Sequence, residues 1–316
     1  MKIAITMNRA KSGEEVPRVS QNEAYVRYVA TAGMTPILIP READPDVIAE
    51  MCDGLLLPGG IDIDPLYYGF SNHGSFYIDP EKDHHERQLL HAFRLSGKKV
   101  FGICRGMQLI FREYLKYETE MERTSGKQYS EIPISRIFGY REHVNDHAQT
   151  SDLNVRRQHP THLVWADLDE LFSTNGIGKE LYPVNSMHHQ ACVYNHGVIN
   201  AIRLIDQKDG KLNIPADFNA EATMNQAPYR DGQLKVVAFT LRGTTIPKLK
   251  TKNITEAFIA GHYSVIEAFK IRGWGGPGAG EIMAVQWHPE ELGTVEMLVN
   301  FFREQAEGPK IKLMTR

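Results

Sequence analysis

Residues 101–108 read Phe-Gly-Ile-Cys-Arg-Gly-Met-Gln, and this stretch decides the fold. An apolar run that begins at Lys99 leads into Cys104, and the apolar spacing that follows predicts a helix over 105–117. A Gly-x-Cys-x-Gly sequence between a strand and a helix is typical of a nucleophile elbow, whose sharp turn holds the reactive side chain above the sheet. The helix N-terminus then favours a thiolate at Cys104. An ordinary turn with a buried, inert cysteine is the alternative.

A second segment supplies the groups that a thiol nucleophile needs. Residues 282–290 begin as a short apolar run that ends in His288, and Glu290 follows shortly after. A base must take the proton of the thiol, and an acceptor must fix the tautomer of that base. Cys104, His288 and Glu290 are therefore the predicted nucleophile, base and orienting carboxylate.

A third segment predicts an oxyanion hole. Residues 53–60 form an apolar strand that ends in a pair of glycines. Backbone N–H groups aimed at a developing oxyanion stabilise it, each by roughly 3 kcal/mol. We assign one donor to Gly60 and the other to the N–H of Arg105, the residue after the nucleophile. A plain turn at the end of a strand is the alternative for this segment.

The first half of the chain alternates predicted strands and helices. The strands are expected at 2–6, 35–39, 53–58 and 99–103, and the helices near 20–32, 44–51, 83–96 and 105–117. This alternation predicts an α/β fold with a mostly parallel sheet and helices on both faces. Sites in such sheets lie at the carboxyl ends of the strands. Gly60, Cys104 and His288 all follow predicted strand ends.

The composition is that of an ordinary globular protein, and we treat residues 1–316 as a single domain. Hydrophobic residues make up 42% and charged residues 24%, with a net charge of −3. The absence of a Lys/Arg block argues against a nucleic-acid partner, and the strand-sized apolar runs argue against a membrane span. Three cysteines give no disulfide framework, so we expect reduced thiols and a cytoplasmic location.

The three segments, together with two others, resemble the class I glutamine amidotransferase-like hydrolases. Within these, they resemble the γ-glutamyl-γ-aminobutyrate hydrolase type, the peptidase C26 group. The resemblance covers roughly residues 1–200 and 262–305, and it implies the flavodoxin-like fold of that superfamily. Its motifs, in the family's order, are Leu-Pro-Gly-Gly at 57–60, Asp-Pro-Glu-Lys-Asp at 79–83 with Glu86, the elbow at 101–108, Val-Asn-Ser-Met-His-His-Gln at 184–190 and Val-Gln-Trp-His-Pro-Glu at 285–290.

The resemblance implies a small-molecule substrate with a γ-glutamyl amide bond. Enzymes of this type attack the side-chain amide carbonyl, release an amine or ammonia, and hydrolyse the resulting γ-glutamyl thioester with water. No cofactor is implied. The α-amino and α-carboxylate end of the glutamyl group would be held by polar side chains, which are Gln108, Asn185, Ser186, His188 and Gln190. A polar turn between strands is the alternative for 185–190.

The chain departs from the family pattern between residues 200 and 280. Compact members connect the same elements with far fewer residues, so we interpret about 205–260 as a β-rich insertion with a strand-like run at 234–241. Such an insertion would serve as a lid, a specificity loop or an oligomer contact. The glycine-rich residues 272–280 predict a mobile hairpin before the strand that leads to His288.

Residues 117–160 are polar and are expected to form surface loops. His143 and His147 have a spacing that some metal sites use, but no helix is predicted there and no cysteine accompanies them. A structural role in a loop is therefore favoured, and no metal site is predicted. Thr161 and His162 fall where the family starts a strand.

Three functions compete. The first is a stand-alone hydrolase of γ-glutamyl amides. The second is a glutaminase subunit that delivers ammonia to a synthetase or transferase partner, docked through the insertion. The third is a binding protein on an inactive amidotransferase fold, which the intact set of Cys104, His288 and Glu290 argues against. The sequence leaves open the leaving amine and whether the chain forms a homo-oligomer.

Overall fold

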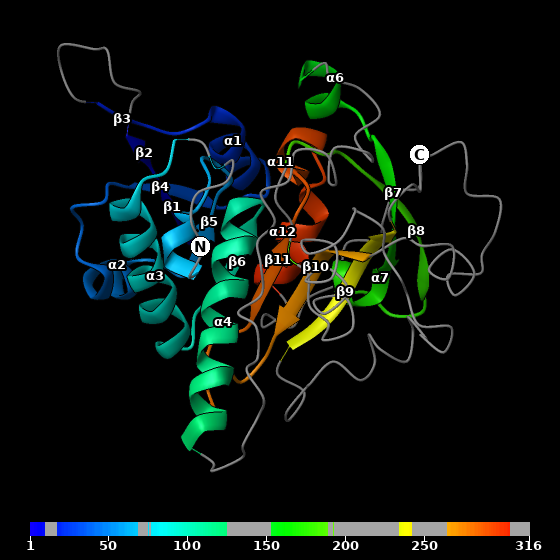
Figure 1. Cartoon of the computed structure of the whole chain (residues 1–316). Helices are drawn as coiled ribbons and strands as arrows, with labels where there is room; N and C mark the ends of the chain where they lie inside the picture. Colours follow the sequence, from blue (N-terminus) through cyan, green and yellow to red (C-terminus); the bar gives the residue numbers. More distant parts are fainter. Residues whose placement is uncertain are drawn as a thin grey trace, which may run out of the picture.

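A nine-stranded sheet crosses the protein in the order β4-β1-β5-β6-β11-β10-β9-β7-β8 (Figure 1). The computed structural model describes residues 1–9, 18–68, 75, 77–124, 153–188, 192, 234–241 and 264–303. The strands are β1 Lys2–Thr6, β4 Thr35–Ile39, β5 Gly54–Leu57, β6 Lys99–Ile103, β7 His162–Asp167, β8 Lys179–Val184, β9 Leu234–Leu241, β10 Ser264–Ile271 and β11 Ile282–Val285. The short strands β2 Asn8–Arg9 and β3 Val19–Ser20 pair separately.

Half of this sheet is parallel. β4, β1, β5, β6 and β11 run in one direction, and the pairs from β11 through β10, β9, β7 and β8 are antiparallel. Gly102 of β6 pairs with Leu57 on one side, and Ile103 pairs with Val285 on the other. Because parallel strands end at the same edge of a sheet, the three motif segments meet at one edge.

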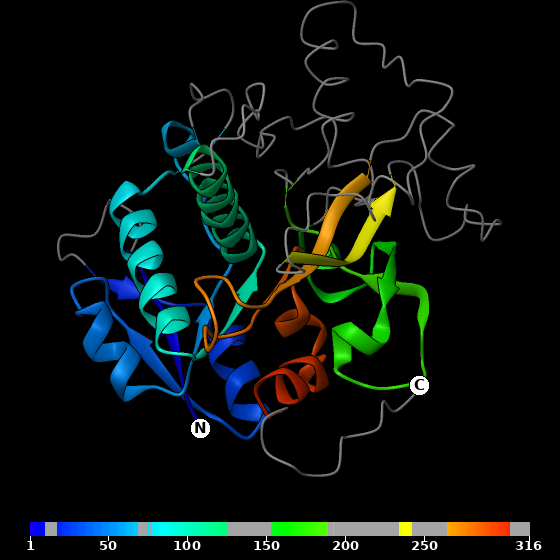
Figure 2. The same ribbon diagram turned by 90° about the horizontal axis from the view of Figure 1, so that it is seen from below.

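Helices cover both faces of the sheet, as predicted. Their bounds are α1 Glu23–Thr31, α2 Pro45–Met51, α3 Pro80–Leu95, α4 Arg105–Thr124, α6 Leu153–Gln158, α7 Leu168–Phe172, α11 Pro289–Leu292 and α12 Val295–Arg303. Buried side chains of α2, α3 and α4 pack in one apolar core, and those of α1, α7 and α12 pack in a second. Figure 2 shows α3 and α4 on one side of the sheet and α12 on the other. The predicted α/β fold class is confirmed.

Helix α3 begins at Pro80 rather than near residue 83. The side chain of Asp79 accepts a hydrogen bond from the N–H of Lys82 and so caps the first turn. Pro80 occupies the first helical position, where its missing N–H costs nothing. Asp44 and Pro45 start α2 in the same way, at the predicted place.

The second half differs from expectation in two places. The predicted surface loop over 117–160 is wrong at both ends, because α4 continues to Thr124 and α6 covers Leu153–Gln158. His143 and His147 lie outside the described residues. The strand-like run in the expected insertion is β9, which lies in the main sheet between β10 and β7. The remainder of 205–260 lies outside the described part of the chain.

The glycine-rich stretch does form a hairpin between β10 and β11. This hairpin packs against α3 through Trp274 and Arg94. Trp274 is fully buried, and the Arg94 guanidinium lies 4.5 Å from the centre of its ring. Arg94 Nη1 also donates a hydrogen bond of 2.8 Å to the Trp274 carbonyl. These contacts oppose the predicted mobility, which composition alone suggested.

Within the described ranges, no helix combines the length and the apolar character needed to cross a bilayer.

Candidate active site

Cys104 sits on a strained turn between β6 and α4. Its φ of 51° is unusual for a residue other than glycine. The N–H of Cys104 donates a 2.7 Å hydrogen bond to the Val285 carbonyl, which fixes the turn against β11. A Cβ atom added at Gly106 would lie 2.1 Å from the Leu57 carbonyl oxygen, so only glycine lets α4 start this close to β5. The geometry is that of a nucleophile elbow.

His288 and Glu290 are paired at the start of α11. His288 Nδ1 donates a 2.7 Å hydrogen bond to Glu290 Oε1, and both side chains are buried. The side chain of Cys104 lies near the imidazole and favours its protonated form. Burial alone would lower the pKa of His288, but the charges of Glu290 and Cys104 outweigh it and raise this pKa to about 10. The imidazole therefore keeps its proton at neutral pH.

The glycine pair after β5 lies against these groups. A Cβ added at Gly59 would lie 2.6 Å from the Tyr25 hydroxyl, 2.8 Å from His288 Cε1 and 3.4 Å from Cys104 Cβ. The N–H of Gly59 donates to the Tyr25 hydroxyl at 3.0 Å. Among the described residues, no acceptor faces the N–H of Gly60. Of the two amides, that of Gly60 is the one without a partner among the described residues.

The side chain of Arg105 is held in a buried ion cluster beside the elbow. Its guanidinium pairs with Asp83 and Glu86 of α3, and Lys82 Nζ lies 2.6 Å from Glu86 Oε1. Burial would raise the pKa of Glu86, but the cations of Arg105 and Lys82 hold it at about 2. This cluster explains the Asp-Pro-x-x-Asp-x-x-Glu motif: Asp79 caps α3, while the other two carboxylates lie one turn apart and hold Arg105.

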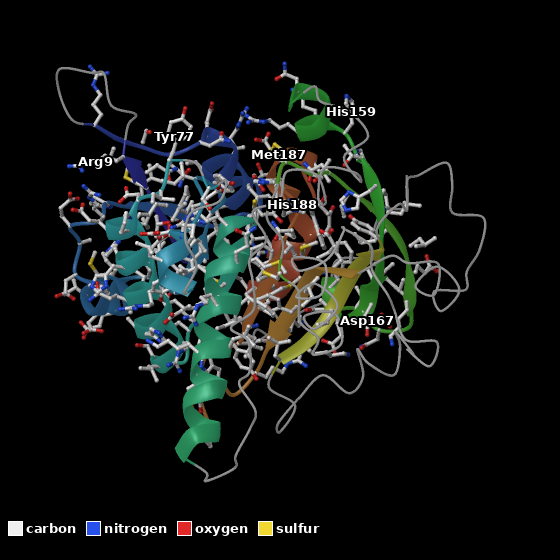
Figure 3. All side chains as sticks on the ribbon, in the orientation of Figure 1. Arg9, Tyr77, His159, Asp167, Met187 and His188 are labelled. Carbon is white, nitrogen blue, oxygen red and sulfur yellow. The ribbon has the colours of Figure 1, made fainter. Side chains whose placement is uncertain are left out.

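The side-chain amide of Asn185 hydrogen bonds with the backbone of His288. Its Oδ1 accepts the N–H of His288 at 2.8 Å, and its Nδ2 donates to the carbonyls of His288 at 3.2 Å and Arg157 at 2.7 Å. These bonds use both amide hydrogens. Ser186 and His188 are buried in the same loop, and Figure 3 labels His188. Gln190 lies outside the described residues.

Gln108 is buried in the first turn of α4. Its Nε2 donates a 3.2 Å hydrogen bond to Oε1 of Gln286, a residue of the His-Pro-Glu segment to which no role was given from the sequence. Gln286 Nε2 is buried and has no hydrogen-bond partner among the described residues. Two side-chain amides thus meet beside the elbow.

A second buried pair of titratable groups lies across the antiparallel strands. His162 Nε2, at the start of β7 as expected, is 3.3 Å from Glu267 Oε1 of β10. Burial raises the pKa of Glu267 to about 7, although the charge of His188 opposes this, and burial lowers the pKa of His162 to about 3. Nothing in the sequence singles out Glu267. Its contact to His162 depends on strand pairing, which local sequence does not reveal.

The parallel half-sheet, the cysteine elbow and the paired His288 and Glu290 define a glutamine amidotransferase-type α/β protein. The chain belongs to the peptidase C26 family, whose model matches residues 2–196, more than half of the chain. The elbow lies inside this range, while His288 and Glu290 lie beyond it.

Named relatives agree with this family. A glutamine amidotransferase-like protein (YvdE homologue) of Lactococcus lactis subsp. cremoris is 25% identical over 173 residues, 53% of this chain and 79% of its own length. A γ-glutamyl-γ-aminobutyrate hydrolase of Escherichia coli O157:H7 is 27% identical over 174 residues, 53% of this chain and 62% of its own. A glutamine amidotransferase-like protein of Rickettsia prowazekii (strain Madrid E) is 32% identical over 116 residues, but this match covers only 34% of this chain and 41% of that protein.

Among solved structures, a Trypanosoma brucei CTPS glutaminase domain with bound acivicin aligns with a TM-score of 0.47 and 13% identity. The alignment covers 98% of this chain and 95% of that one.

Proposed function

We propose that the protein is a cysteine-dependent hydrolase of γ-glutamyl amides. Cys104 is the nucleophile, His288 the acid–base group and Glu290 its orienting carboxylate. The observation that carries the proposal is the convergence of Tyr25, His288 and Cys104 on Gly59, all within 3.4 Å of one added Cβ position. A thiol, a paired imidazole and an amide-rich turn at one point are the requirements of acyl transfer.

The proposed reaction has two halves. The Cys104 thiolate attacks the γ-carbonyl carbon, and the N–H groups of Gly60 and Arg105 receive the oxyanion. His288 gives its proton to the leaving nitrogen, the C–N bond breaks, and a γ-glutamyl thioester remains on Cys104. His288 then takes a proton from water as its oxygen attacks the thioester, and glutamate leaves while the thiolate returns.

For substrate binding, we propose that Gln108, Ser186, His188 and Gln190 face the α-amino and α-carboxylate end of the glutamyl group. Their amide, hydroxyl and imidazole groups offer both donors and acceptors. Because the amide hydrogens of Asn185 are already used, we assign that residue to the positioning of His288 instead. The Escherichia coli relative, named a γ-glutamyl-γ-aminobutyrate hydrolase, supports this class of substrate.

A glutaminase subunit with a synthetase or transferase partner is the second candidate, favoured by relatives named glutamine amidotransferase-like. The test is turnover by the isolated chain, with γ-glutamyl-GABA, γ-glutamyl-putrescine and glutamine supplied side by side. A stand-alone hydrolase turns over at least one γ-glutamyl amine without a partner. Glutamine hydrolysis that requires a partner would favour the subunit, and inactivity with every substrate and partner would leave a binding protein. The three free thiols suit the reducing cytoplasm that we propose.

A titration of His288 tests the proposed acid–base group without any substrate. A raised pKa means that the protonated form persists below the folded-state value and is lost as the pH rises through about 10. We expect the ¹³Cε1–H signal of His288 in NMR spectra to titrate near that pH. Glu290→Gln removes the charge that raises the pKa, so the midpoint should fall. A wild-type midpoint within about one unit of the ordinary value of 6.5 would contradict the assignment.

We propose that the chain is one domain and that the 205–260 segment shapes the amine side of the pocket or an oligomer contact. Because β9 belongs to the sheet, the test must keep it. Replacing residues 205–231 with a Gly/Ser linker should change KM, amine preference or oligomeric state, while burst-phase acylation of Cys104 persists. A folded variant that cannot be acylated would show that this segment contributes to the chemistry.

A further inference from the structure

Tyr25 of α1 lies at the centre of the candidate site, although 263 residues separate it from His288. Its hydroxyl oxygen is 3.4 Å from His288 Nδ1 and accepts the N–H of Gly59 at 3.0 Å. The side chain is only 4% exposed. One oxygen atom therefore contacts both the glycine turn, which carries the proposed oxyanion donor Gly60, and the imidazole of His288.

The contacts of this hydroxyl give it a defined role. Burial raises the pKa of Tyr25 well above its ordinary value, and the charges of Glu290 and Cys104 raise it further, so the phenol keeps its proton. The oxygen accepts the N–H of Gly59, and it lies 3.4 Å from His288 Nδ1. Glu290 is in turn the acceptor for His288 Nδ1. A continuous chain of contacts thus runs from the glycine turn through the Tyr25 hydroxyl to His288, and from His288 to Glu290.

We propose that Tyr25 is a positioning residue that couples the oxyanion turn to the His288–Glu290 pair. It fixes the Gly59–Gly60 backbone and the imidazole relative to each other, so the sulfur, the base and the oxyanion donors keep one geometry. The catalytic meaning of this coupling rests on the proposed function. Whether the Tyr25 hydroxyl keeps His288 aligned beside Cys104 can be tested without substrate.

Tyr28 provides a matched control on the same helix. It is also buried, at 2% exposed, and its hydroxyl donates a 3.0 Å hydrogen bond to the Thr294 carbonyl. Tyr25→Phe and Tyr28→Phe therefore each remove one buried, hydrogen-bonded hydroxyl from α1. A role in stability alone predicts similar effects of the two changes, whereas the proposed coupling predicts an effect on Cys104 from Tyr25 only.

The first readout is the rate at which iodoacetamide alkylates Cys104 near neutral pH, followed by peptide mass spectrometry. A misaligned His288 stabilises the thiolate less well, so we expect Tyr25→Phe to slow the reaction about fivefold. Tyr28→Phe should change the rate less than about twofold, and thermal unfolding should show that both variants are folded. The buried Cys52 and Cys192 serve as internal references in every sample.

The second readout is a double-mutant cycle with Glu290→Gln. If Tyr25 acts through Glu290 and His288, the Phe substitution should slow alkylation less than about twofold in the Glu290→Gln background, because interacting residues are not additive. An unchanged rate in the single variant, an equal loss in Tyr28→Phe, or a full additional loss in the double variant would each overturn the proposal.

The third readout uses hydrolysis. With an active γ-glutamyl substrate, Tyr25→Phe should lower kcat about tenfold and leave KM within about twofold, since transition-state alignment is lost while binding contacts remain. A loss confined to KM would contradict the positioning role. If the wild type hydrolyses no γ-glutamyl amide, the proposed function fails, yet the alkylation rates still decide whether Tyr25 aligns His288.

Discussion

Cys104→Ala is expected to lower the turnover of γ-glutamyl amides by more than about 10³-fold, because no other described thiol meets His288. The fold should survive. Alanine adopts the φ of 51° with strain similar to that of cysteine, and the N–H bond to Val285 remains. Circular dichroism should therefore match the wild type, and Cys104→Ser should be similarly inactive.

Cys52→Ala provides the control for this prediction. Cys52 is also a buried free thiol, but it lies at the end of α2, away from the elbow. Its variant should keep wild-type turnover. Cys104→Ala with more than a few per cent of wild-type activity, at a native-like circular dichroism spectrum, would remove Cys104 from the mechanism.

His288→Ala is expected to cost about 10³-fold in kcat/KM, and Glu290→Gln about tenfold less. His288 moves the proton in both halves of the proposed reaction. Glu290 only orients the ring, and glutamine keeps an acceptor for the 2.7 Å hydrogen bond from Nδ1. Steady-state kinetics of purified variants measures the difference.

His159 gives a control for histidine removal in general, since it is exposed and carries no assigned role (Figure 3). His159→Ala should retain wild-type kcat/KM. Equal activity of His288→Ala and wild type would exclude His288 as the acid–base group. A Glu290→Gln variant more impaired than His288→Ala would reverse the assigned roles.

The parts of the fold that could be predicted are those with local causes. The strand before Cys104 and the helix after it are set by apolar periodicity, and the elbow needs Gly106 because α4 approaches Leu57 closely. The start of α3, which is predicted three residues too late, also has a local cause. The start of α3 depends on the capping side chain of Asp79 and on Pro80, which the periodicity of apolar residues does not detect.

The contacts that complete the site have long-range causes. Tyr25 meets Gly59 and His288 only because α1 packs on the face of the sheet beside α12, and nothing near residue 25 indicates it. In the same way, the spacing of Asp83 and Glu86 places both on one face of a helix, but only the tertiary packing brings Arg105 between them. The motif predicts that Asn185 binds substrate, but its hydrogen bonds to the backbone of His288 and Arg157 are visible only in the structure.

The place of β9 in the sheet depends on partners that local sequence does not reveal. Its residues predict a strand, and the unusual spacing of the surrounding motifs places that strand in the expected insertion. Pairing with β10 and β7 places the strand inside the sheet. Strand order depends on partners that are distant in sequence. A hydrophobic pattern therefore predicts that a segment is a strand, but it does not predict which strands it pairs with.

In the proposed mechanism, Cys104 carries the γ-glutamyl group during turnover. Acid quenching of the wild type while it hydrolyses a slow γ-glutamyl amide, followed by peptide mass spectrometry, tests it directly. We predict a mass increase of one glutamyl residue on the peptide that contains Cys104, absent from Cys104→Ala and from the peptides of Cys52 and Cys192. Demonstrated turnover with no adduct at any time after mixing, or with the adduct on another cysteine, would exclude Cys104 as the nucleophile.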